Sequence, residues 1–294
     1  MLFASIDIGS NAGRLLVATV LEYKGHAITD KVTLVRVPLR LGIDVFEKGE
    51  ISYQREELLI NTLKAYKQLI AIYNPIDFVA CATSAMRHAK NGSSIIDRIK
   101  KETDINLNII DGLTEAKIIS EAGNVDMHKP YPYSLYIDVG GGSSELSWYK
   151  NDSLIAVKSF KIGTIRELYN LTQKQEWDAL KNWLADLNIN GKEINCICSG
   201  GNINKLTKLY GSKHQNLLSY QQLNKGLKFL KSHTIEDRIS LLGLRKDRAD
   251  VIVPAAIIFK QIMKWSGIKE LHSPKIGLAD GLIVELYKKH KGFN

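Results

Sequence analysis

The 294-residue chain is poor in cysteine and has no long apolar run, and each scarcity excludes a class of protein. Its three cysteines, Cys81, Cys196 and Cys198, are an odd number at spacings that suit neither a disulfide framework nor a zinc site. The most apolar run, residues 251–259, contains Pro254 and falls far short of the ~20 residues that a membrane span needs. We therefore expect buried structural cysteines and no membrane partner.

The N-terminus also lacks the basic segment of a secretion signal, and Asp7 interrupts its first apolar stretch. A cytoplasmic location is the resulting expectation. With 45% hydrophobic and 24% charged residues, the composition is typical of a soluble globular protein and excludes a collagen-like or disordered chain. The length is sufficient for about two domains.

The charge is unbalanced toward the basic side, with 40 lysines and arginines against 31 aspartates and glutamates, a net charge of +9. A basic surface favours polyanionic partners such as nucleotides, polyphosphate or nucleic acid. The excess is spread along the chain and forms no long basic arm. Nucleic-acid binding would rest on charge alone, so we do not favour it.

Short apolar strands alternate with amphipathic helices along the chain, which indicates an α/β protein. The clearest helical pattern covers residues 53–73. A polar stretch with two prolines at 124–133 is expected to separate an N-terminal domain, 1–125, from a C-terminal domain, 126–294. The last predicted helix, about 278–290, belongs to the second domain in this division or packs back on the first.

One internal repeat stands out, because Ile6-Asp7-Ile8-Gly9-Ser10-Asn11 recurs as Ile137-Asp138-Val139-Gly140-Gly141-Gly142. Each copy ends a predicted strand and precedes a second β pattern. The second copy and the residues after it are expected to form a β-hairpin around the glycines. Two copies of a strand, an aspartate and a glycine turn predict a duplicated fold whose halves face each other.

The second copy has the composition of a phosphate loop. Gly140, Gly141 and Gly142 let the backbone approach a ligand closely, and their N–H groups can form an anion nest. Ser143 and Ser144 add hydroxyl donors. The flanking carboxylates, Asp138 and Glu145, would suit a hydrated magnesium ion bound to a phosphate. The alternative is an ordinary glycine-rich hairpin turn.

The first copy, with Asp7, Ser10 and Asn11, has fewer glycines and is equally well explained as a capped tight turn. A third close-approach turn is expected at Gly200 and Gly201, which follow a buried strand. None of these turns matches the Walker or the dinucleotide-binding fingerprint.

Glu115 follows a strand and a turn, in the first turn of a predicted helix, where the helix N-terminus keeps a carboxylate ionised. Such a group can accept a proton from an attacking water, although acidic residues are also routine there. Arg87 follows a buried strand and could clamp a phosphate, as could Arg14; the alternative for each is a solvated surface arginine. We expect Thr83 or Ser84 to cap the helix that carries Arg87.

Together these segments resemble the exopolyphosphatase / guanosine pentaphosphate phosphohydrolase (Ppx/GppA) phosphatase family. Its fold is the duplicated two-domain actin–Hsp70–sugar kinase (ribonuclease H-like) fold with an interdomain cleft. The resemblance runs from about Phe3 to Leu286. The segments that carry it are Ile6–Asn11 with Arg14, Arg40-Leu41-Gly42, Ala82–Arg87, Gly112-x-x-Glu115-Ala116, Asp138–Glu145, Ser199-Gly200-Gly201 and Gly277–Leu282.

The resemblance implies roles for the matching residues. Glu115 corresponds to the catalytic glutamate that activates water, and Arg87 to the arginine near the scissile phosphate. Asp138 and Glu145 correspond to carboxylates that support Mg²⁺ or another divalent cation. Asp7 is also expected to be a metal ligand. The implied phosphate-binding residues are Ser10, Asn11, Arg14, Gly140, Gly141, Gly142, Ser143, Ser144, Gly200 and Gly201.

The implied reaction is release of the terminal orthophosphate of inorganic polyphosphate. Hydrolysis of guanosine pentaphosphate is an alternative, and a low-activity sensor that binds guanosine tetraphosphate is another; a sugar kinase is disfavoured because of Glu115. Many members have a second glutamate where this chain has Thr114. Longer members add a C-terminal helical domain that this sequence does not include, so we expect reduced processivity, and a homodimer could supply the missing walls.

Overall fold

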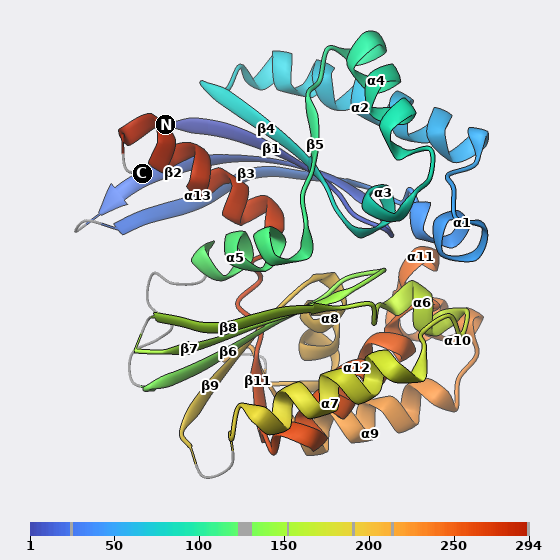
Figure 1. Cartoon of the computed structure of the whole chain (residues 1–294), viewed down its shortest axis with the longest axis vertical. Coiled ribbons are helices and arrows are strands. Elements are labelled where there is room, and N and C mark those ends of the chain that lie inside the picture. Colours follow the sequence, from blue (N-terminus) through green and yellow to red (C-terminus); the bar gives the residue numbers. More distant parts are fainter. Residues whose placement is uncertain (24–25, 123–130, 152, 190–191, 213–214, 293–294) are drawn as a thin grey trace. The chain divides into compact units, whose positions relative to one another are not determined.

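The structure is a computed structural model of the whole chain, and it describes residues 1–23, 26–122, 131–151, 153–189, 192–212 and 215–292. The chain divides into two compact units. Unit 1 comprises Met1–Val125 and Gly277–Asn294, and unit 2 comprises Asp126–Ile276 (Figure 1). The predicted boundary at 125/126 lies outside the described residues. The final helix is part of unit 1, one of the two placements that the sequence left open.

Unit 1 contains a five-stranded sheet in the order β3-β2-β1-β4-β5. Strands β1, β2 and β3 form an antiparallel meander, whereas β4 and β5 run parallel to β1. The elements are β1 (Leu2–Ile8), β2 (Gly13–Tyr23), β3 (His26–Val37), α1 (Leu41–Lys48), α2 (Tyr53–Tyr73), β4 (Asp77–Ala82), α3 (Ser84–His88), α4 (Gly92–Thr103), β5 (Leu107–Ile109), α5 (Gly112–Ala122) and α13 (Leu278–Lys291).

Unit 2 repeats this arrangement. Its six-stranded sheet has the order β10-β11-β9-β6-β7-β8, with β6, β7 and β8 antiparallel and with β9 parallel to β6. The elements are β6 (Tyr133–Val139), β7 (Ser144–Lys150), β8 (Ser153–Phe160), α6 (Thr164–Leu168), α7 (Lys174–Asp186), β9 (Ile194–Ser199), α8 (Gly201–Tyr210), β10 (Leu217–Ser219), α9 (Tyr220–Lys231), α10 (Ile235–Leu242), α11 (Lys246–Ala249), α12 (Ile252–Ser266) and β11 (Glu270–His272). The repeated topology confirms the duplicated α/β fold expected from the internal repeat.

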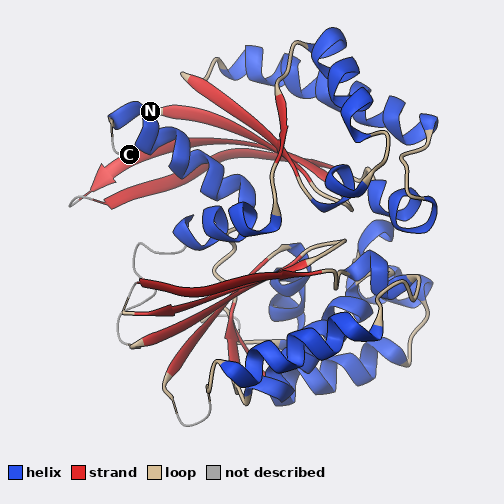
Figure 2. Cartoon of the chain, in the orientation of Figure 1, coloured by secondary structure: helices blue, strands red, loops and turns tan. Residues whose placement is uncertain are grey.

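The centre of the sheet of unit 1 is buried because helices cover both of its faces (Figure 2), whereas the edge strand β3 keeps exposed side chains such as Val32 and Leu34. On one face, Leu59, Leu63 and Tyr66 of α2 pack with Ile6 and other strand residues in one apolar cluster. On the other face, α13 packs against β1 and β2, and a neighbouring cluster joins it to α5. The buried positions of α2 recur at intervals of three and four, so the helix predicted over 53–73 is confirmed.

The cysteines are free and buried, as predicted. Cys196 and Cys198 belong to the apolar core of unit 2, whereas Ile197 between them lies in a different cluster, as the alternation of a strand requires. Burial raises the pKa of the Cys81 thiol to about 12, which leaves it protonated and inert at neutral pH. No helix within the described ranges is both long and apolar enough to cross a bilayer.

Helices α13 and α5 approach each other closely at Gly281. A Cβ atom at this position would lie 2.3 Å from the carbonyl oxygen of Ile118 and 2.5 Å from its Cγ2. Because the first of these atoms is backbone, a side chain here forces the two helices apart. Gly281→Ala is therefore expected to lower the free energy of unfolding by about 1–3 kcal/mol, measured by urea denaturation.

The control for this prediction is Gly277→Ser, at the N-cap of the same helix. A Cβ atom there meets nothing within 4 Å, and serine is a favoured N-cap residue. The control should unfold at the wild-type urea concentration or above. Equal unfolding midpoints for Gly281→Ala and the wild type would show that the two helices move apart without a loss of stability.

Candidate functional site

A row of polar side chains crosses the sheet of unit 2 where β6 ends. Asp138 pairs in register with Ser199 of β9 on one side and with Glu145 of β7 on the other, and Glu145 pairs with Ser159 of β8. The Ser199 hydroxyl donates to Asp138 Oδ1, and the Ser159 hydroxyl donates to Glu145 Oε1 at 2.8 Å. The two serines therefore fix both carboxylates in place.

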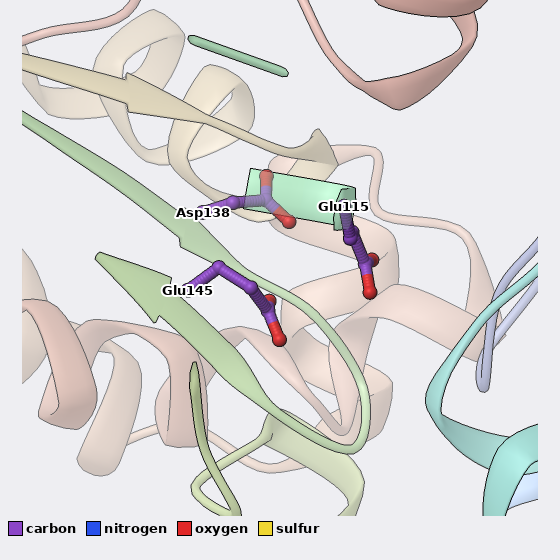
Figure 3. A group of neighbouring side chains, drawn as sticks. All are labelled: Glu115, Asp138 and Glu145. Atoms are coloured by element: carbon purple, nitrogen blue, oxygen red, sulfur yellow. The ribbon is translucent and has the colours of Figure 1, made fainter. Parts of the chain in front are cut away.

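Asp138 and Glu145 project from neighbouring strands, as Figure 3 shows. Carboxylate oxygens of the two residues lie within 4.8 Å of each other, and Glu145 is only 2% exposed. Two adjacent, largely buried carboxylates repel each other unless a cation lies between them. Oxygen donors of this kind suit Mg²⁺, which keeps several of its waters when few protein ligands are present. The pair therefore fits a hydrated divalent cation.

The glycine loop that follows β6 is held by the start of α6. The carbonyls of Gly140 and Gly141 accept from the backbone amides of Thr164 at 3.0 Å and Ile165 at 2.8 Å. In a trans peptide, the carbonyl of one residue and the N–H of the next point in opposite directions. Because these carbonyls face α6, the amides of Gly141 and Gly142 face away from it, as an anion nest requires.

The loop serines differ from each other. The Ser144 hydroxyl donates to the Ile162 carbonyl at 2.6 Å, so its proton is already committed within the protein. Ser143 lies at the turn itself, and its carbonyl accepts from the Gly140 amide at 2.9 Å, which closes the loop. Of the two hydroxyls, that of Ser143 is the better candidate for a phosphate contact.

The turn after β9 also requires glycine. Gly200 has φ +105, and a Cβ atom there would lie 3.5 Å from Asp138 Oδ1. A Cβ atom on Gly201 would lie 2.8 Å from Nη2 of Arg248, so this guanidinium covers the start of α8. Arg248 thus adds a positive charge to the turn that carries Gly200 and Gly201, a feature that the glycines alone did not indicate.

The corresponding row in unit 1 is basic. Asp7 of β1 pairs in register with Cys81 of β4 and Arg14 of β2, and Arg14 pairs with Arg36 of β3. Arg14 Nη1 lies 2.6 Å from Asp7 Oδ2. The aspartate, predicted as a metal ligand, is thus engaged by a guanidinium. Two arginines beside one carboxylate make this row better suited to an anion than to a cation.

The first turn, at Ser10 and Asn11, is held like the glycine loop. The Ser10 carbonyl accepts from the Gly42 amide at 2.9 Å, and the Asn11 carbonyl accepts from the Arg40 amide at 3.0 Å. Arg40 takes φ +54 to make this contact, a conformation unusual for a residue with a side chain. The Ser10 hydroxyl is buried and has no hydrogen-bond partner among the described residues. An unsatisfied buried hydroxyl at such a turn is a candidate ligand contact.

Glu115 and Arg87 come together within unit 1. Glu115 lies in the first turn of α5 and is 7% exposed, and its Oε2 is 3.7 Å from Nη1 of Arg87, at the end of α3. The same Nη1 donates to the Ile110 carbonyl at 2.6 Å, which fixes the guanidinium. The sequence proposed both residues separately, and the fold places them side by side.

The start of α5 is capped by Asp111, whose Oδ1 accepts from the amides of Leu113 at 2.8 Å and Thr114 at 2.9 Å. These hydrogen bonds, first that of the Thr114 amide, lower the pKa of Asp111. The Thr114 hydroxyl also donates to Asp111, so the residue that departs from the usual family pattern stabilises the cap.

Thr83 occupies the N-cap of α3, but the expected capping hydrogen bond from its side chain is absent there.

Two mixed sheets that share one strand order, apart from the additional β10 in unit 2, and that each have a turn after the first strand define a duplicated α/β protein. A model of the Ppx/GppA phosphatase family matches residues 19–290. The chain therefore belongs to the Ppx/GppA phosphatase family, which confirms the resemblance drawn from the motifs.

Individual relatives agree with this placement. Exopolyphosphatase 1 of Mycobacterium leprae is 25% identical over 95% of this chain and 87% of its own length. The bifunctional 3-dehydroquinate synthase/phosphatase of Fusobacterium nucleatum is 29% identical over 90% of this chain, which spans only 43% of that protein. The crystal structure of the Aquifex aeolicus family member superposes with a TM-score of 0.76 at 27% identity, covering 99% of this chain and 98% of that one.

Proposed function

We propose that this protein hydrolyses a phosphoanhydride bond and releases the terminal orthophosphate of inorganic polyphosphate. The observation that supports it most is the pairing of the buried Glu115 with the partly exposed Arg87, 3.7 Å apart at the N-terminus of α5. A carboxylate held there can take a proton from water, and the guanidinium beside it can stabilise charge on a transferring phosphoryl group.

In the proposed mechanism, Glu115 orients a water molecule for in-line attack on the terminal phosphorus and accepts its proton. The oxygen that bridges to the rest of the chain leaves with the electron pair of the broken P–O bond, and orthophosphate is released. The amides of Gly141 and Gly142 bind non-bridging phosphate oxygens, and Arg87 stabilises charge on the transferring phosphoryl group. Asp138 and Glu145 would hold Mg²⁺ through its waters, and the ion would neutralise charge on the phosphates.

The substrate is proposed from two features. The net charge of +9 and the arginine row of unit 1 favour a highly charged anion. A relative that covers nearly the whole chain is named an exopolyphosphatase. Guanosine pentaphosphate carries the same terminal anhydride, so the same residues could act on it.

The test is orthophosphate release with Mg²⁺ from short polyphosphate, long polyphosphate and guanosine pentaphosphate, measured side by side. We expect the highest kcat/KM on a polyphosphate. A preference for guanosine pentaphosphate would move the assignment to the alternative substrate. Tight binding of guanosine tetraphosphate with no release from any of the three would replace the hydrolase by a sensor.

A further inference from the structure

A half-buried arginine beside the glycine loop, Arg166, has no role in the mechanism above. Arg166 of α6 donates through Nε to the Gly142 carbonyl at 2.8 Å. It thereby completes a series in which the carbonyls of Gly140, Gly141 and Gly142 all accept hydrogen bonds from α6. The first two donors are backbone amides, which most residue types could supply. The third is a side chain, and only this one depends on the residue type.

The contact at Gly142 also sets the direction of the next amide. Because the Gly142 carbonyl points to Arg166, the N–H of Ser143 in the same trans peptide points the opposite way. Together with the preceding peptides, this turns the amides of Gly141, Gly142 and Ser143 away from α6. Three successive amides turned in this way form the nest that the proposed function needs.

The start of α6 lies unusually close to the loop, which requires glycine at the N-cap. A Cβ atom on Gly163 would lie 2.5 Å from the carbonyl oxygen of Gly141 and 2.5 Å from both the nitrogen and the carbonyl carbon of Gly142. These atoms are all backbone, so any side chain at this position would displace the loop or the helix. Gly163 therefore allows the contact that Arg166 completes.

The charge of Arg166 is itself unusual for its place. Burial lowers the pKa of its guanidinium, and Glu176 opposes this effect more weakly. Partial burial of a cation costs free energy, and an anion bound nearby recovers part of that cost. A phosphate bound at the loop would therefore be favoured by the Arg166 guanidinium.

We propose that the contacts of Gly163 and Arg166 with the glycine loop keep its amides turned toward the phosphates. Arg166 is thus a positioning residue for phosphate binding. This inference rests on the proposed function, because it assigns the loop to phosphate. We further infer that α6, which lies outside the segments that carry the family resemblance, determines how tightly the glycine loop binds phosphate.

The test measures binding of imidodiphosphate, a non-hydrolysable phosphoanhydride analogue, to the full chain by calorimetry with Mg²⁺. Arg166→Met removes the donor and the charge and should weaken binding by about tenfold or more, the usual effect of losing a charged hydrogen bond. Arg166→Lys keeps the charge and one donor and should bind severalfold more tightly than Arg166→Met. It also keeps the proposal testable if Arg166→Met does not fold.

The matched control is Lys161→Gln, which removes one exposed positive charge just before α6 and should bind like the wild type. The amide resonances of Gly141 and Gly142 provide a readout that general destabilisation does not imitate. Imidodiphosphate should shift them in the wild type and in the control, and far less in folded Arg166→Met. Wild-type affinity in Arg166→Met, or an equal loss in Lys161→Gln, would overturn the proposal.

Because the probe is not hydrolysed, this result is separable from the proposed function. If the wild type binds imidodiphosphate through these amides yet releases no orthophosphate from any substrate, the positioning role of Arg166 can still hold, but the proposed hydrolase function is wrong. If the wild type releases orthophosphate and Arg166→Met has unchanged KM and affinity, the proposed hydrolase function is supported and the positioning role of Arg166 is wrong.

Discussion

Glu115→Gln is expected to lower kcat by about 10²–10⁴-fold, the range that general base catalysis contributes, while the protein remains folded. The amide replaces the carboxylate with a group of the same shape that cannot accept a proton from water. Substrate affinity should change little, because Glu115 carries no favourable charge for an anion. Steady-state orthophosphate release, substrate binding and thermal unfolding together measure these three effects.

The matched control is Glu56→Gln. Glu56 is also a first-turn carboxylate of a helix in unit 1, and it also pairs with an arginine, Arg98, at 3.0 Å. It differs from Glu115 in belonging to α2, away from the residues assigned to chemistry. Turnover of the control should equal that of the wild type. A full wild-type kcat in Glu115→Gln would remove Glu115 from the mechanism.

Replacing either carboxylate of unit 2 has the second-largest expected effect. Asp138→Asn and Glu145→Gln should each lower kcat by about 10²-fold or more at fixed Mg²⁺, because metal stabilisation of transition-state charge is worth several kcal/mol. The concentration of Mg²⁺ needed for half-maximal rate should rise in both variants. A Mg²⁺ titration of the initial rate measures it.

The stability of these two variants provides an independent check. Two carboxylates within 4.8 Å repel each other in the metal-free protein, so neutralising one should leave the melting temperature unchanged or raise it. Ser159→Ala removes the hydroxyl that donates to Glu145 but leaves both carboxylates, and its Mg²⁺ requirement should shift much less. An unchanged Mg²⁺ requirement in both carboxylate variants would show that the ion binds elsewhere.

Much of the fold follows from local pattern. The alternation of apolar residues predicted strands in both sheets and the helix Tyr53–Tyr73, because burial on one face imposes a period on the sequence, but it did not reveal the short strands β10 and β11. The repeated aspartate–glycine turn predicted the duplication. Residues 247–265 have the apolar pattern of one long helix, but the helix begins only at Ile252, and a separate short helix, Lys246–Ala249, precedes it. Strand β8 was not predicted, since its exposed residues break the apolar alternation.

The site was predictable only where chemistry and sequence motif coincide. Glu115, Asp138 and Glu145 stand in recognisable segments, but Arg36, Arg166 and Arg248 do not. Arg36 lies beside Arg14 through the register of their strands. Arg166 reaches the glycine loop from a helix that follows an unpredicted strand, and Arg248 reaches the third turn through its contact with Gly201. Each lies far along the chain from the turn it serves, so only tertiary pairing reveals it. The sequence signal that was available for Arg166 is the nearby Gly163, because a glycine just before a helix indicates a close approach to another part of the backbone.

Phosphate release in ¹⁸O-labelled water shows whether Glu115 activates water for the hydrolysis. Wild type and Glu115→Gln are incubated with polyphosphate and Mg²⁺ at equal enzyme concentration, and the released orthophosphate is analysed by mass. We predict one labelled oxygen in each orthophosphate released by the wild type, and almost no release by the variant. Unlabelled orthophosphate, or equal release by both proteins, would contradict the account.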